Sequence, residues 1–210
     1  MSHVANCCSI VELREYTLHP GTRDDLIDLF DREFVESQEV LGVHVIGQFR
    51  DVDRPDRFVW LRGFPDMDSR LASLTSFYSG PAWDEHKDAA NATMIDSDNV
   101  LLLRPRRDAS GFAHPPRRTR DEPSMASHAY SVSVVARTEY SETVRDGGGI
   151  LLAELESEPS ANTYPRLPIR EGEDVVVTVR RHSTVDEIDP VHTATALTMR
   201  LTPTSRSELA

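Results

Sequence analysis

The sequence is poor in several features that define whole classes of protein. Among 210 residues there are two cysteines, adjacent at Cys7 and Cys8, and a single lysine, Lys87. Two neighbouring cysteines provide neither a disulfide framework nor the cysteine spacing of structural zinc sites. No stretch reaches the roughly 18 consecutive apolar residues that a membrane helix needs. We therefore expect no disulfide, no bound metal ion and no membrane span.

Basic residues are also fewer than acidic ones, with 23 Lys and Arg against 35 Asp and Glu. The net charge is therefore -12, and the isoelectric point is about 5.1. An acidic surface repels phosphate backbones and anionic lipids, so neither nucleic acid nor membrane is an expected partner. The opening residues, MSHVANCCSIVELREY, contain no basic start followed by an apolar run and no arginine-rich amphipathic helix. This pattern predicts a cytoplasmic protein.

Several catalytic motifs are missing as well. The glycines of RDGGGI are not followed by the Gly-Lys-Ser/Thr of a phosphate loop, and no dinucleotide-binding fingerprint occurs. A Gly-x-Ser-x-Gly nucleophile elbow is absent, although a Ser/His/Asp triad assembled from distant residues stays open. The sequence therefore favours a protein that works without a cofactor.

What the first half does contain is an alternation of strand and helix patterns. Strands are predicted at 9–18, 43–52, 57–64 and 99–105, from runs of β-branched and aromatic residues that end at turn signals. Helices are predicted after Thr22, which forms a capping box with Asp25, after Asp66, and from Pro81 onward. The order strand, helix, strand, strand, helix, strand is that of a ferredoxin-like unit, in which helices cover one face of an antiparallel sheet.

The second half repeats this pattern with weaker helices. Strands are predicted at 127–138, 149–159, 173–182 and 194–203, whereas the intervening segments are short, polar and broken by glycine or proline. We predict an α+β protein of two tandem ferredoxin-like units that form an α/β barrel, the second with reduced helices. The predicted boundaries are 8–105 for the first unit, 106–126 for a Pro/Arg-rich linker and 127–206 for the second. The linker either lies over the acidic surface of its own chain or grips an anionic ligand.

Four segments carry a resemblance to a known family: VELREYTLHPGTRDDLIDLF, FVWLRGFPDM, FYSGPAWDEHKDAANATMIDSDNVLLLRP and, in the second half, SEPSANTYPRLPIREGED. They resemble the NIPSNAP family of dimeric α+β barrel proteins. The resemblance implies a ferredoxin-like barrel and says little about function. It is most specific around Trp83, His86, Asn91 and Met94. We also expect a homodimer, formed by pairing of edge strands.

The predicted site lies between the first-half sheet and its helices. Period-2 alternation places Phe58, Trp60 and Arg62 on one face of the third strand, and Arg14 and Tyr16 on one face of the first. By the same rule His44, Ile46, Gln48 and Arg50 share a face of the second strand. On the helix that begins at Pro81, Trp83, His86, Lys87, Ala90 and Met94 form one stripe, which faces either a core or a ligand. An aromatic wall with few polar groups is typical of a pocket for a flat, mostly apolar ligand.

We predict three catalytic residues: His86 as acid or base, Tyr78 as donor to an oxyanion, and Arg62 as anion anchor. The predicted substrate-binding residues are Arg14, Tyr16, Gln48, Phe58, Trp60, Trp83, Asn91 and Met94. The alternative for each is a structural role, with the aromatic residues in the core and His86 bonded to a neighbouring carbonyl.

The favoured function is that of a bacterial enzyme of secondary or catabolic metabolism. It would carry out cofactor-independent proton transfer or oxygenation on an aromatic, polyketide-like or enolisable substrate, as a monooxygenase, isomerase or cyclase does. The first alternative is a ligand-binding or scaffold protein without catalysis. The second alternative is a haem-dependent enzyme, in which a histidine ligates the iron.

Overall fold

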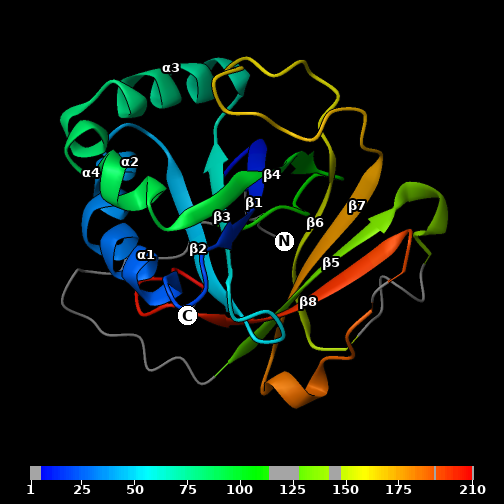
Figure 1. Cartoon of the computed structure of the whole chain (residues 1–210). Helices are drawn as coiled ribbons and strands as arrows, with labels where there is room; N and C mark the ends of the chain where they lie inside the picture. Colours follow the sequence, from blue (N-terminus) through cyan, green and yellow to red (C-terminus); the bar gives the residue numbers. More distant parts are fainter. Residues whose placement is uncertain (1–5, 114–127, 142–147, 192, 210) are drawn as a thin grey trace.

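Eight antiparallel strands close into one barrel within the chain (Figure 1). The computed structural model describes residues 6–113, 128–141, 148–191 and 193–209. Around the barrel the strand order is β1-β3-β2-β8-β5-β7-β6-β4, and β4 pairs with β1 to complete the circle. The strands are β1 (Ile10–Leu18), β2 (His44–Asp51), β3 (Arg57–Phe64), β4 (Met94–Pro105), β5 (Ala129–Ala136), β6 (Ile150–Ser157), β7 (Val175–His182) and β8 (Ala196–Pro203).

The barrel consists of two ferredoxin-like units with the same topology. In the first unit the strands lie in the order β4-β1-β3-β2, and in the second the corresponding order is β8-β5-β7-β6. The units join where β2 pairs with β8 and where β4 pairs with β6, each over a short register. The predicted tandem repeat and barrel are confirmed. The predicted unit boundaries stay predictions.

Helices cover only the first unit (Figure 1). They are α1 (Arg23–Leu29), a π-helical stretch (Phe30–Phe34), α2 (Val35–Glu39), α3 (Met67–Tyr78) and α4 (Pro81–Asn91). In the described part of the second unit, only two single 3-10 turns, Arg137–Glu139 and Val185–Glu187, stand in their place. None of the helices in the described ranges is long and apolar enough to cross a membrane.

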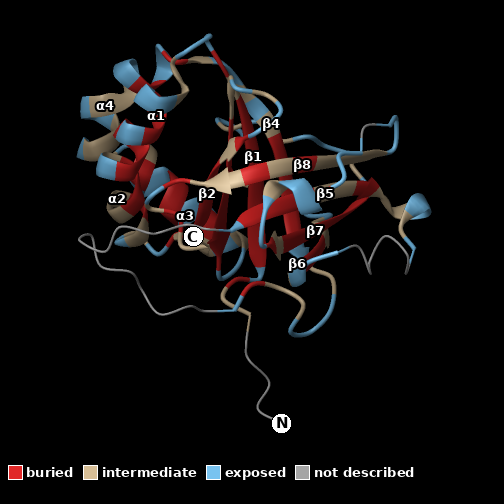
Figure 2. Cartoon of the chain, turned by 90° about the horizontal axis from the view of Figure 1, so that it is seen from below, coloured by how far each residue is buried: buried red, intermediate tan, exposed pale blue. Residues whose placement is uncertain are grey.

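The buried apolar residues form two cores on opposite faces of the sheet. Figure 2 shows buried residues both along the strands and on the helices. The inner core fills the barrel with side chains from all eight strands, among them Leu13, Leu61, Val132 and Val177. The outer core lies between the first-unit sheet and the helices and is rich in aromatic rings. Because side chains alternate along a strand, β1 and β3 supply both cores.

Local signals in the sequence predict correctly where two of the helices begin. Asp66 caps α3, since its carboxylate accepts a 2.7 Å hydrogen bond from the backbone N–H of Ser69, and Pro81 begins α4. The predicted capping box at Thr22 is wrong, because the Thr22 hydroxyl donates instead to the carbonyls of His19 and Thr93. In this way Thr22 ties the start of α1 to the start of β4.

The predicted face of β2 is wrong, because this strand contains a β-bulge. The register shifts between Val45 and Gly47, so Ile46 points into the barrel while Gln48 pairs with Trp60 on the helix side. One extra residue in a strand reverses the alternation beyond it. His44 and Ile46 therefore do not share a face with Gln48.

The loop that connects β6 and β7, residues 158–174, extends across the first unit toward α3 (Figure 1). Tyr164 of this loop is buried in the outer core, and Leu167 and Ile169 pack against it. The second unit thus contributes to the first unit's helix layer.

Candidate functional site

A cavity of about 110 Å³ lies between the helices and the outer face of β1 and β3. Its wall is mostly aromatic and apolar, with Phe30, Phe34 and Phe77 from the helices and Leu167 from the loop at 158–174. Seven of the residues predicted to form the site line it: Arg14, Tyr16, Trp60, Tyr78, Trp83, Asn91 and Met94.

Beneath this cavity a single carboxylate is shared by three guanidinium groups. Glu12 pairs with Arg14 at 2.7 Å, with Arg62 at 2.8 Å and with Arg70 at 2.6 Å, and all four side chains are buried. Strand register explains two of these contacts, because Glu12 and Arg62 are directly opposite in β1 and β3 and Arg14 is two residues along β1. Within the described residues, the ion pairs of these three arginines all end on Glu12. The cluster therefore has a formal charge of about +2.

The cluster fixes the charge state of its members. Burial alone would raise the pKa of Glu12, but the charges of Arg62, Arg14 and Arg70 outweigh burial and hold this pKa well below its usual range. Burial would likewise lower the pKa of Arg14, yet interaction with Tyr16 and Glu12 raises it. Arg14, which lines the cavity, is thus a permanent cation.

Two further polar groups of the cavity wall are donors. Burial raises the pKa of Tyr78, against the opposing effect of Arg62, so Tyr78 is a neutral phenol at physiological pH. The buried indole N–H of Trp60 has no hydrogen-bond partner among the described residues. A buried donor without a partner costs free energy, which a ligand oxygen would recover.

The loop at 158–174 closes the cavity on one side. The ring of Tyr164 stacks on that of Tyr78, with centroids 6.0 Å apart and an interplanar angle of 22°. Arg70 donates to Asn162 and Thr163 of the same loop at 3.1 and 3.2 Å. The buried charge cluster therefore also holds the loop in place.

Four predicted site residues lie outside the lining of the cavity. The imidazole of His86 is 22 % exposed and its Nε2 is 3.5 Å from a carboxylate oxygen of Glu33. Arg62 is one layer deeper, with its guanidinium carbon 5.0 Å from the centre of the Trp60 ring. Phe58 packs in the outer core, and Gln48 is buried with its amide atoms unpartnered in the described structure.

Sequence reasoning missed Glu12 and Arg70. Apolar periodicity in the sequence predicts that α3 buries a stripe of Met67, Leu71, Leu74 and Tyr78. In the structure, however, Leu71 is 38 % exposed and Arg70 is fully buried. A helix that buries a charge is hard to recognise from apolar periodicity, because the charged position is read as solvent-facing. The available signal was Glu12, an acid in the middle of a strand and on the same face as Arg14.

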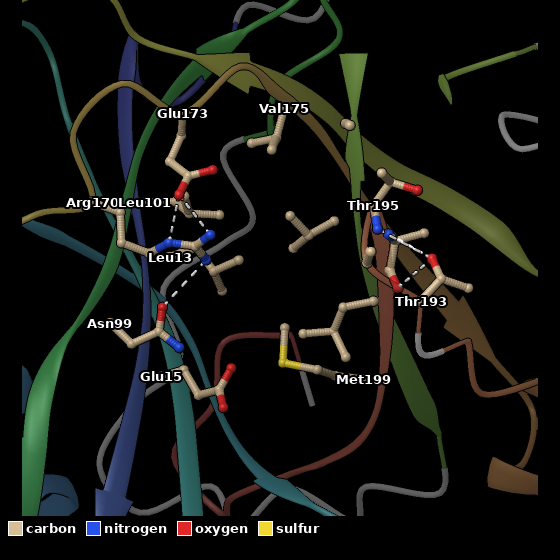
Figure 3. Close-up of a pocket in the computed structure, with 15 residues that line it drawn as sticks. Leu13, Glu15, Asn99, Leu101, Arg170, Glu173, Val175, Thr193, Thr195 and Met199 are labelled. Atoms are coloured by element: carbon tan, nitrogen blue, oxygen red, sulfur yellow. Dashed lines mark hydrogen bonds and ion pairs between the residues drawn. The ribbon is translucent and has the colours of Figure 1, made fainter. Parts of the chain in front are cut away.

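A second cavity, of about 270 Å³, opens at one end of the barrel (Figure 3). Its apolar floor includes Leu13, Leu101 and Met199 of the barrel interior. Its rim is charged, but Arg170 pairs with Glu173 at 2.7 Å, and Glu15 pairs with Arg54 and Arg57 elsewhere. Charges that already neutralise one another give little attraction for a ligand, so this cavity is the weaker candidate.

A third, more open hollow of about 570 Å³ lies on the outer face of the second unit, where helices are reduced. Here the hydroxyl of Ser131 and Nε2 of His182 are 2.9 Å apart. In the described residues, however, Nδ1 of His182 has no hydrogen-bond partner. The carboxylate that completes a catalytic triad is therefore not in place.

The described arginines around the predicted linker are paired with acids of β6. Arg104 contacts Glu156 at 2.9 Å, and Arg106 and Arg107 both contact Glu154. This part of the segment lies over acidic groups of its own chain. Residues 114–126 of the predicted linker lie outside the described residues.

Comparison with known proteins gives similar structures and a family model that matches part of the chain. No curated protein matches the chain. A proposed monooxygenase from Lactobacillus acidophilus has a similar structure over 94 % of this chain and 96 % of its own, with 10 % identity and a TM-score of 0.52. This similarity extends through both units and supports the fold.

Solved structures of NIPSNAP proteins align with part of the chain. A NIPSNAP-like domain protein from Burkholderia xenovorans covers 57 % of this chain and 100 % of its own, at 22 % identity and a TM-score of 0.46. A NIPSNAP family protein of unknown function from Agrobacterium tumefaciens covers 50 % and 96 %, at 19 % identity and a TM-score of 0.44. The family model of NIPSNAP matches residues 11–109, which include every residue of the Glu12 cluster. Residues 11–109, just under half of the chain, are therefore similar to the NIPSNAP family.

Proposed function

We propose that the helix-side cavity binds a single-ring aromatic or enolisable molecule with an acidic oxygen and stabilises its anion. Ionisation of an enol or phenol is the first step of both cofactor-independent proton transfer and cofactor-independent oxygenation. The proposed function is therefore that of a small-molecule enzyme that begins by forming a bound enolate or phenolate.

The observation that carries this proposal is the charge of the Glu12 cluster. A fully buried group of three guanidiniums and one carboxylate is costly, because buried charges need balancing partners. An anion beside Arg14 supplies the missing negative charge. In a buried site such an interaction is much stronger than in water.

The size of the cavity supports a single ring. About 110 Å³ is well below the roughly 300–1,000 Å³ of pockets for drug-sized molecules, whereas an apolar cavity of about 150 Å³ takes benzene. A polyketide or a haem does not fit this volume. Both the larger substrates and the haem-dependent alternative are disfavoured on that ground.

Each polar or aromatic residue of the cavity has a separate role in the proposed reaction. Arg14 holds the developing oxyanion, and the phenol of Tyr78 donates a hydrogen bond or a proton to it. Trp60 and Trp83 form the walls against which the ring packs. The role of His86 as proton acceptor and that of Arg62 as anion anchor stay predictions, because both residues lie outside the cavity lining.

Hydrogen–deuterium exchange at the benzylic α-carbon of a phenyl-substituted ketone such as phenylacetone tests the reaction. The protein in heavy water should accelerate exchange, and Tyr78→Phe and Arg14→Gln should each reduce the acceleration at least tenfold. If His86→Ala reduces it equally, His86 is the base. A protein that binds the ketone without accelerating exchange would support the alternative of a non-catalytic binding protein.

A further inference from the structure

The end of the barrel where β1 begins gathers two thiols and an imidazole. Sγ of Cys7, Sγ of Cys8 and a ring nitrogen of His44 all lie within 4.8 Å of one another. Sγ of Cys8 is 3.5 Å from Nδ1 of His44. None of these three residues lines the helix-side cavity, and they take no part in the function proposed for it.

The spacing of these atoms suits a tetrahedral metal ion. Zinc–sulfur bonds of about 2.3 Å and zinc–nitrogen bonds of about 2.0–2.1 Å, at the tetrahedral angle, place sulfur and nitrogen roughly 3.6 Å apart. The observed separation of Cys8 and His44 is 3.5 Å. A disulfide between the two cysteines fits less well, since adjacent Cα atoms are about 3.8 Å apart and unstrained disulfides need about 4.4–6.8 Å.

Backbone hydrogen bonds hold both cysteines in place. The N–H of Cys7 donates to the carbonyl of Phe112 at 2.7 Å, and the N–H of Ser9 donates to Phe64 at 3.1 Å. Gly63 of β3 leaves room for Cys8, because a Cβ on this glycine would lie 2.2 Å from the Cys8 sulfur. The position of the two cysteines close to the N-terminus predicts a flexible segment with ordinary thiols. Residues 6–9 are instead fixed to the barrel.

The imidazole of His44 is oriented by a carboxylate from the other end of the chain. Nε2 of His44 hydrogen-bonds to Glu208, so Nδ1 is the nitrogen that faces Cys8. A carboxylate on the far nitrogen of a histidine is the usual support of a metal-ligating imidazole. Glu208 is held near β2 because Ser207 next to it accepts a hydrogen bond from the N–H of Gln48.

We propose that Cys7, Cys8 and His44 bind a thiophilic divalent cation of the zinc class, with Glu208 as the positioning residue. The two sulfurs and Nδ1 occupy three tetrahedral positions, and the fourth is open to water or another ligand. Each thiol releases its proton to solvent as it ligates the ion. The sequence predicts no metal because neither its cysteines nor its His, Asp and Glu residues have metal-ligand spacing, whereas the fold brings His44 and Glu208 to the two cysteines.

Cobalt titration of the reduced, metal-free protein tests this site. One equivalent of Co²⁺ should produce a thiolate-to-cobalt charge-transfer band, and Zn²⁺ should abolish the band by competition. Cys7→Ser, Cys8→Ser and His44→Gln should each lose or strongly weaken the band. The matched control His19→Gln, at an exposed histidine, should leave it unchanged.

Glu208→Gln distinguishes a metal site from a structural cluster. It keeps all three ligands, so it should bind cobalt with the same stoichiometry but about 10–100-fold more weakly. Circular dichroism of each variant identifies any variant that fails to fold. If a ligand variant does not fold, the cobalt affinity of Glu208→Gln decides the outcome. The proposal is overturned if the reduced native protein gives no thiolate band, if the band survives removal of both thiols, or if Cys7 and Cys8 form a disulfide in freshly purified protein.

Discussion

Glu12 illustrates how one residue can decide the character of a site. It is the shared partner of three arginines, so its charge holds together a cluster that spans β1, β3 and α3. Arg14 was predictable from strand alternation, because Tyr16 and the residues of β3 beside it form an aromatic face. The burial of Glu12 was not predictable, because a buried acid has no periodic signature and its partner Arg70 lies on a helix.

We predict that Glu12→Gln is far more damaging than Arg14→Gln. Glu12→Gln leaves three buried guanidinium groups without a counter-charge, which should lower the free energy of unfolding by about 3–5 kcal/mol. Arg14→Gln removes one of the excess cations and should cost less than half as much. Urea denaturation of both variants measures the difference. Equal losses would show that the cluster carries no excess of positive charge.

Asp31 gives a prediction for pH dependence. Burial raises its pKa from 3.8 to about 6, although Thr204 and Ser205 donate hydrogen bonds to it. A raised pKa in the folded state stabilises the protein below pH 3.8, and this contribution is lost as pH rises through about 6.

The isostere Asp31→Asn cannot ionise. Its stability relative to the native protein should therefore increase between pH 4 and pH 7 by up to about 3 kcal/mol. Denaturation midpoints at several pH values measure this. A stability difference that is constant over this range would contradict a raised pKa for Asp31.

At the scale of elements, the loop at 158–174 has a role that its sequence did not reveal. The segment SEPSANTYPRLPIREGED resembles the corresponding segment of a known family, yet it has no periodicity that predicts packing. In the structure it packs beside the helices as part of the cover of the first-unit cavity, because β6 pairs with β4 and the β6–β7 connection lies beside α3. Helix and strand positions were predictable from local patterns. This long-range contact was not.

We predict that Tyr164→Ala opens the cavity. Tyr164 is buried and stacks on Tyr78, so its removal should expose the nearby indole of Trp83. Quenching of tryptophan fluorescence by acrylamide should increase severalfold, and the matched variant Tyr140→Ala, in the second unit, should not change it. Unchanged quenching in Tyr164→Ala would mean that the loop does not close the site.

At the scale of the whole molecule, barrel closure changes the expectation for assembly. The predicted homodimer was based on edge strands, but all eight strands have two neighbours within the chain. A dimer of the full chain, which stays a prediction, has to use other surfaces. The two units and the barrel that they form were predictable from the repeated strand order, whereas the strand pairs that close the barrel, β2 with β8 and β4 with β6, have no sequence signature.

The isolated first half should behave differently from the full chain. Residues 6–113 alone leave β2 and β4 as open edges and expose the inner face of the sheet, including Leu13, Leu61 and Leu101. We expect this fragment to dimerise and rebuild a barrel from two copies. Light scattering coupled to size-exclusion chromatography gives its mass. A folded, stable monomer would show that the second unit is dispensable for the core.

The central claim is that the cavity beside Arg14 stabilises a small aromatic anion, and 4-nitrophenol tests it most directly. Its phenolate absorbs visible light, so a spectrophotometric pH titration at saturating protein gives the pKa of the bound phenol. We predict that this pKa is at least one unit lower than in free solution, that Arg14→Gln removes the shift, and that Arg32→Gln, at a side chain 61 % exposed, preserves it. An unshifted or raised pKa in the native protein would contradict the account.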